Sequence, residues 1–71
     1  MKNTLVDRKE VGRRLTELRG IRTRVGTAKE IGISNEELSW FERGLRTPTD
    51  MKKVLLANYY GVSVQRLFFT E

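Results

Sequence analysis

Cysteine and histidine are both absent from this 71-residue chain. Without them the protein can form no disulfide, no metal site with thiolate or imidazole ligands, and no acid–base machinery built on histidine. The carboxylates are scattered along the sequence, and no glycine-rich loop of the kind that cradles phosphates is present. We therefore expect neither an enzyme nor a protein that holds a metal or a cofactor.

Long apolar runs are also lacking. The longest covers only residues 54–57, whereas a membrane-spanning helix needs about 18 apolar residues. The basic N-terminus is not followed by the apolar stretch of a secretory signal. We expect a cytoplasmic protein without membrane contact, built as one domain over residues 1–71 with a short N-terminal arm at about residues 1–4.

Positive charge is concentrated in the N-terminal third of the chain. Lysine and arginine number 14 against 9 acidic residues, which gives a net charge of +5. The whole excess lies in residues 1–24, and the remainder is neutral. A basic segment in a small domain favours a polyanionic partner, with a solvated basic helix face as the alternative.

The apolar residues recur at steps of three and four, which is the spacing of one helix face, and no run alternates as a strand would. This pattern predicts an all-α protein, a compact five-helix bundle. The predicted helices span about Leu5–Arg19, Arg24–Ile31, Asn35–Arg43, Asp50–Tyr60 and Val64–Phe69. Their predicted core-facing residues are Val11, Leu15, Leu18, Ala28, Ile31, Leu38, Phe41, Met51, Val54, Ala57, Tyr60, Val64, Leu67 and Phe68.

Cap residues support these helix ends. Ser34 and Glu37 form the pattern of a capping box, in which each side chain bonds the backbone amide of the other residue. Further N-cap candidates are Thr49 and Ser63, and the glycines at positions 20, 32, 44 and 61 suit left-handed C-caps.

The second helix has the weakest signal. Val25, Gly26 and Thr27 together cost about 2 kcal/mol relative to alanine. Thr27 also begins a second capping-box pattern, which offers a later start for this helix. Tertiary packing therefore has to hold it.

The segment that joins the second and third helices carries the most specific pattern. A small residue at Ala28 allows two helices to approach closely, Gly32 supplies the turn, and Ile33 fills its corner. Leu38 and Phe41 then face the core. This spacing is typical of a helix-turn-helix.

In these residues the chain resembles the phage-repressor, or Cro/CI-type, helix-turn-helix family. The matching elements are Gly12–Arg19, Ala28–Ser34, Phe41–Gly44, Pro48, Leu56–Ala57, Gly61–Ser63 and Leu67–Phe68. The resemblance implies a lambda-repressor-like domain that binds operator DNA, usually as a dimer. It implies a sequence-specific transcriptional regulator, a repressor of the phage or mobile-element type, that reads double-stranded DNA with the helix from about Asn35 to Arg43.

Two features depart from the family pattern. The segment from Leu15 to Gly32 is about two residues shorter than usual, so that residues 20–22 must turn tightly. Arg24 stands where the family usually has a glutamine, and Thr27 where an apolar residue is usual. Both departures bear on the DNA contacts near the second helix.

The resemblance implies two sets of DNA-contacting residues. The base contacts fall on Asn35, Glu36, Ser39 and Trp40. The phosphate contacts fall on Arg22, Thr23, Arg24, Lys29, Arg43, Arg46 and Thr47. Asparagine can pair with adenine and glutamate can accept from cytosine. The alternatives are a merely solvated Glu36, a Trp40 that is partly buried in its own domain, and arginines that are simply exposed.

Two further expectations concern contacts between helices and between copies. The resemblance implies a partly buried ion pair between Arg19 and Glu42. Leu55 and Tyr59 look surplus to the predicted core face of the fourth helix, so we expect them, with Phe69, to form the contact of a weak homodimer on DNA. The alternative is a rotated fourth helix that buries Leu55.

A second class of function remains open. Glu36, Glu37 and Trp40 on one exposed helix face would also suit a protein-interaction module on a helix-turn-helix scaffold, such as an anti-repressor or an antitoxin-like subunit. Only phosphate binding makes affinity for DNA fall steeply with salt, which separates the two hypotheses.

Overall fold

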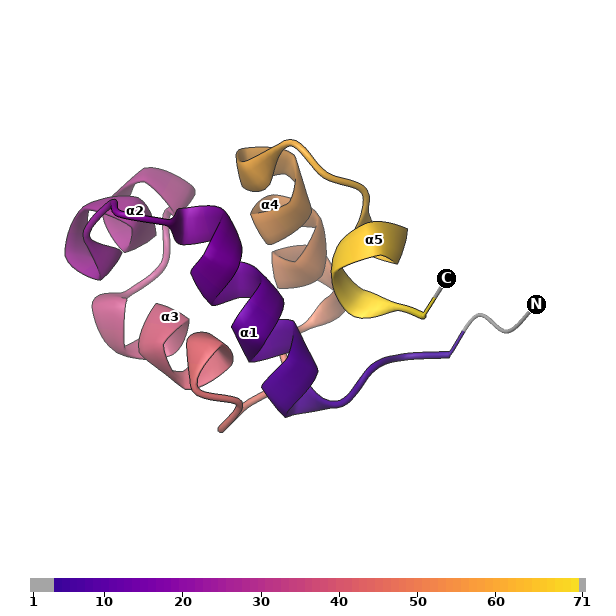
Figure 1. The fold of residues 1–71 in the computed structure, drawn as a ribbon. Helices are drawn as coiled ribbons and strands as arrows, with labels where there is room; N and C mark the ends of the chain where they lie inside the picture. Colours follow the sequence, from indigo (N-terminus) through magenta and orange to yellow (C-terminus); the bar gives the residue numbers. More distant parts are fainter. Residues whose placement is uncertain (1–3, 71) are drawn as a thin grey trace.

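Five short helices make up the computed structural model, which describes residues 4–70. They are α1 (Arg8–Arg19), α2 (Arg24–Ile31), α3 (Asn35–Glu42), α4 (Asp50–Tyr60) and α5 (Val64–Phe68). Figure 1 shows α1 in the middle, with α2 and α3 on one side and α4 and α5 on the other. Within residues 4–70 there is no strand longer than a single antiparallel bridge, between Leu5 and Phe69. The predicted all-α, five-helix fold is therefore confirmed.

Each helix begins at a small polar residue whose side chain accepts a hydrogen bond from an amide three residues later. These N-caps are Asp7, Thr23, Ser34, Thr49 and Ser63. The Thr23 cap settles the start of α2 at Arg24, so the later start at Thr27 is wrong. Only half of the predicted capping box forms, because the Glu37 carboxylate accepts from Lys52 Nζ of α4.

The first helix starts three residues later than predicted. Asp7 caps it by accepting from the Glu10 amide at 2.8 Å, while the residues before Asp7 pair with the C-terminal segment instead. Val6 N donates to Phe68 O at 3.0 Å, and Thr70 N donates to Thr4 O at 2.7 Å. Thr4, the last residue of the predicted N-terminal arm, is therefore hydrogen-bonded to the folded domain. Residues 1–3 of the arm lie outside the described part of the chain.

The third and fifth helices each end one residue earlier than predicted. Arg43 is the C-cap of α3, and the next residue, Gly44, adopts a φ of +73° that ends the helix. Phe69 follows α5 in an extended conformation, in which it forms the bridge to Leu5.

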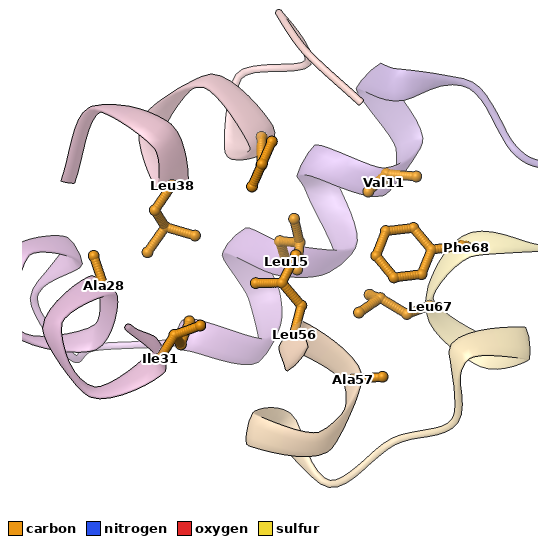
Figure 2. Packing of buried hydrophobic residues seen from close by; sticks show 10 residues of the cluster. Val11, Leu15, Ala28, Ile31, Leu38, Leu56, Ala57, Leu67 and Phe68 are labelled. Atoms are coloured by element: carbon orange, nitrogen blue, oxygen red, sulfur yellow. The ribbon is translucent and has the colours of Figure 1, made fainter. Parts of the chain in front are cut away.

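All five helices contribute to one hydrophobic core, as Figure 2 shows. The buried members are Val11, Leu15, Ala28, Ile31, Leu38, Phe41, Leu56, Ala57, Leu67 and Phe68. Most of the predicted core is present, and Leu18, Tyr60 and Val64 pack at its edge.

The predicted core face of α4 is correct at Ala57 and Tyr60 and wrong at Met51 and Val54. Met51 and Val54 are 76% and 48% exposed, whereas Leu56 is fully buried. The inward stripe is Lys53, Leu56, Ala57 and Tyr60, at the i, i+3, i+4, i+7 spacing of one helix face. Lys53 occupies an inward position because its aliphatic stem is buried while its ammonium group lies 5.8 Å from the ring centre of Phe68.

The helices α1 and α3 cross at very close range. A Cβ atom added at the buried Gly12 would lie 2.2 Å from the carbonyl oxygen of Glu42 and 2.9 Å from that of Phe41. Only a glycine in α1 lets the last turn of α3 come this near.

We predict that Gly12→Ala destabilises the fold by about 3 kcal/mol, because the added methyl group meets backbone atoms that cannot move without separating the helices. Urea denaturation measures the change. The control Glu17→Ala, on the exposed side of α1, should stay within about 0.5 kcal/mol of the parent. A Gly12→Ala variant as stable as the parent would contradict the close crossing, since alanine is otherwise the better helix former.

Candidate nucleic-acid interface

The turn between α2 and α3 has the geometry of a helix-turn-helix. Gly32 adopts a left-handed conformation with φ of +97°, and the amides of Gly32 and Ile33 both donate to the carbonyl of Ala28. Ala28 is fully buried and Ile33 packs against the core. The turn is thus closed by backbone hydrogen bonds, which hold α3 at a fixed angle to α2.

The outward face of α3 carries the predicted base-contacting residues. Leu38 and Phe41 point into the core, so the opposite side of the helix faces solvent. Asn35 and Glu36 are exposed there, and Ser39 and Trp40 are half-buried on its two flanks. The four side chains therefore lie on one accessible surface of one helix.

Trp40 is held by a residue from the loop that follows α3. The guanidinium carbon of Arg46 lies 4.1 Å from the centre of the Trp40 ring. A cation stacked on an indole at this distance is attracted by the negative face of the ring. The stack covers one ring face and leaves Trp40 half-buried in its own domain, as the alternative expectation allowed.

The predicted phosphate-contacting residues form one group at α2 and one group after α3, and Arg22 belongs to neither. Thr23, Arg24 and Lys29 lie on α2 or cap it, and Arg43, Arg46 and Thr47 follow α3. All of them are exposed except Arg24, which is half-buried. The side chain of Arg24 is more than a third exposed, and one of its terminal nitrogens lies 3.7 Å from Glu42 Oε1. Arg22 instead bonds the protein itself.

A buried ion pair joins the ends of α1 and α3. Arg19 donates from Nε and one terminal nitrogen to the two carboxylate oxygens of Glu42, at 2.8 and 3.1 Å. The Glu42 side chain is only 3% exposed and that of Arg19 is 17% exposed. The hydrogen bonds that Arg19 donates to Glu42 raise the pKa of Arg19 above its ordinary value.

The residues predicted to contact a second copy differ in their exposure to solvent. Leu55 is 42% exposed on α4, beside the exposed Met51 and Val54. Tyr59 and Phe69 are both half-buried against the core of their own domain. Tyr59 instead accepts a hydrogen bond from Arg22, so two residues that the sequence assigned to different partners bind one another.

Within residues 4–70, no helix is long and apolar enough to cross a membrane. The same residues contain no group of three aspartates, glutamates, histidines or cysteines placed to hold a metal ion.

Neither a protein-family model nor a curated protein sequence matches the chain. The solved structures that share its fold include the following two. The restriction-modification controller protein C.AhdI from Aeromonas hydrophila has a TM-score of 0.75 and 26% sequence identity, over 84% of this chain and 90% of that protein. The DNA-binding domain of BldD has a TM-score of 0.72 and 28% identity, over 86% of this chain and 92% of that domain.

We predict that Glu42→Gln costs about 3 kcal/mol of stability, because the substitution keeps the shape but leaves the Arg19 guanidinium buried without a counter-charge. Chemical denaturation should show a lower midpoint with an unchanged slope. Glu17→Gln, which removes an exposed partner of Arg13 on the same helix, is the control and should change stability by less than about 0.5 kcal/mol. A loss below about 1 kcal/mol for Glu42→Gln would mean that the pair does not hold the helices.

Proposed function

We propose that this protein is a sequence-specific DNA-binding regulator of transcription that places α3 in the major groove. The observation that carries the proposal is the exposed polar face of α3, held rigidly by a helix-turn-helix in a fold that is similar to the DNA-binding domain of BldD. Helix-turn-helix proteins read base edges with such a face. Because the chain resembles the phage-repressor family in the residues given above, we propose a repressor of the phage or mobile-element type.

Three polar side chains and the indole ring of Trp40 are the base-contacting groups that we propose. The Asn35 amide matches the donor–acceptor pattern of adenine, and the Glu36 carboxylate can accept from the amino group of cytosine. Ser39 can donate or accept, and the uncovered part of Trp40 suits a thymine methyl group. Because Arg46 is stacked on Trp40, the ring meets the DNA in a fixed orientation.

Affinity comes from the basic groups of α2 and of the segment that follows α3. The acidic start of α3 opposes DNA, but Glu37 is neutralised by Lys52 and only Glu36 remains exposed without a partner among the described residues. Arg43, Arg46 and Thr47 follow α3, and Thr23, Arg24 and Lys29 line α2. These six residues are the phosphate contacts that we propose, and Arg22 is not among them.

The proposed homodimer uses the exposed strip of α4 formed by Met51, Val54 and Leu55. The three side chains lie on the solvent side of one helix at i, i+3 and i+4. A strip this small supports only weak association. A two-fold pair would bring two α3 helices about 34–36 Å apart, one turn of DNA. Dimers should therefore form weakly in solution and tighten on an operator.

Selection from duplexes with a randomised centre tests the proposed function. The protein should enrich one sequence, arranged as an inverted repeat, and its affinity for that duplex should fall steeply as salt is raised. Absence of any enriched sequence, together with binding that does not respond to salt, would contradict DNA recognition. That outcome would favour the protein-interaction module instead.

Two substitutions separate base contacts from phosphate contacts. Asn35→Ala should relax the preference at one base pair by about 1–3 kcal/mol and hardly change binding to unrelated DNA. Arg43→Ala should weaken binding to every sequence and lower the slope of log affinity against log salt by about one unit. Arg13→Ala, which removes the same charge from α1 outside the proposed interface, is the control. An unchanged slope for Arg43→Ala would remove it from the interface.

We predict that Met51→Glu combined with Leu55→Glu yields a folded monomer that still binds a half-site but loses at least about tenfold in affinity for the full repeat. Sedimentation with and without DNA measures the association. Ile21→Glu removes another fully exposed apolar side chain, from the turn after α1, and should leave dimerisation unchanged. If the double variant associates like the parent, α4 is not the contact.

A further inference from the structure

Arg22 is an exposed residue, and its guanidinium makes three hydrogen bonds to acceptors of its own domain. It donates from Nε to the carbonyl of Arg19 at 3.2 Å and from one terminal nitrogen to the carbonyl of Leu18 at 3.1 Å. Its other terminal nitrogen donates to the hydroxyl of Tyr59 at 3.1 Å. The first two acceptors are carbonyls at the C-terminal end of α1, where no further turn of helix supplies donors and a positive charge is favourable.

Tyr59 continues this chain of contacts from α4 to α2. Its hydroxyl donates to the carboxylate of Glu30, and this bond raises the pKa of Tyr59, so the hydroxyl remains a donor at neutral pH. The guanidinium carbon of Arg22 lies 5.5 Å from the ring centre of Tyr59 and 5.7 Å from that of Tyr60. The two rings meet edge to face, with centres 5.0 Å apart. We call Arg22, Glu30, Tyr59 and Tyr60 the turn cluster.

The turn cluster closes the short connection between α1 and α2. Gly20 leaves α1 with a φ of +64°, and only residues 20–23 separate the two helices. The carbonyl of Arg22 accepts from Arg19 at 2.7 Å, so both the backbone and the side chain of Arg22 are held. The next residue, Thr23, is the N-cap of α2.

The start of α2 has little stability of its own. Val25 and Gly26 are exposed, poor helix formers, and only Thr27, Ala28 and Ile31 anchor this helix in the interior. Beside the contact of Arg24 with Glu42, the first turn therefore depends on what holds the residues before it. Those residues are held by Arg22, and Arg22 is held by Tyr59.

We propose that Arg22 and Tyr59 are positioning residues, which fix the first turn of α2 so that Thr23 and Arg24 meet the DNA backbone in register. The role of these two residues in DNA binding rests on the proposed function. Their role in ordering the first turn of α2 is independent of it. Arg22 acts through the turn cluster and does not contact phosphate, because three of its N–H groups are bonded to protein acceptors and the group lies over two aromatic rings.

Hydrogen exchange tests the ordering of α2 without DNA. The amide of Gly26 donates to Thr23 Oγ1 at 3.1 Å and that of Thr27 to Thr23 O at 3.0 Å, so both amides report on the first turn. Tyr59→Phe, which removes only the hydroxyl, and Arg22→Ala should each speed exchange at these two amides by about two- to tenfold. The control Arg13→Ala should leave the exchange rates of these two amides unchanged. Unchanged exchange at both amides in both variants would overturn the proposal, whatever the protein binds.

Salt titration on a fixed 24-base-pair duplex of mixed sequence tests the coupling to DNA. Arg22→Ala and Tyr59→Phe should both weaken binding by about two- to tenfold, with a salt slope equal to that of the Arg13→Ala control. Arg24→Ala, as a direct contact, should lower the slope by about one unit. A slope lowered by one unit in Arg22→Ala, or full affinity in Tyr59→Phe, would overturn the positioning role. Absence of DNA binding by the parent protein would overturn the proposed function instead, and the exchange experiment would still decide the ordering of α2.

Discussion

The buried carboxylate of Glu42 is the point to which three helices are tied. It ends α3, receives two hydrogen bonds from Arg19 at the end of α1, and lies 3.7 Å from a terminal nitrogen of Arg24 at the start of α2. A carboxylate withdrawn from water is tolerated only with such partners, so the helices cannot shift without exposing an unpaired charge. The close crossing at Gly12 brings the backbone of α1 to the carbonyl of this same residue. Side-chain and backbone contacts thus fix one end of α3 together.

The internal pairing of charges decides which acidic side chain of α3 is left exposed without a partner among the described residues. Of the three acidic residues on this helix, Glu37 binds Lys52 of α4 and Glu42 binds Arg19, which leaves Glu36 exposed. The helix is therefore less repulsive to a phosphate backbone than its sequence suggests. The arginines also divide into two groups. Arg19 and Arg22 bond groups of their own domain, whereas Arg43 and Arg46 follow α3 and are exposed to solvent.

Local signals explain why most helix ends could be predicted. An N-cap side chain bonds an amide three residues away, and a glycine with positive φ ends a helix by its own backbone preference. Ser34, Thr49, Ser63 and Gly32 act within their own segments, and the structure places them as predicted. Leu5 was misplaced because its partner, Phe69, lies at the other end of the chain.

Sequence alone determined the helical class, the five elements, the helix-turn-helix spacing and the candidate base-contacting face, because each depends on residues within a few positions of one another. Only the tertiary structure decided the rotation of α4, where the stem of Lys53 takes an inward place that its charge would assign to the surface. Tertiary structure also decided the partners of Arg22 and Tyr59, which are 37 positions apart and meet because α1, α2 and α4 converge. Periodicity shows which side of a helix is apolar, but the partner of a long polar side chain depends on which helices pack beside it.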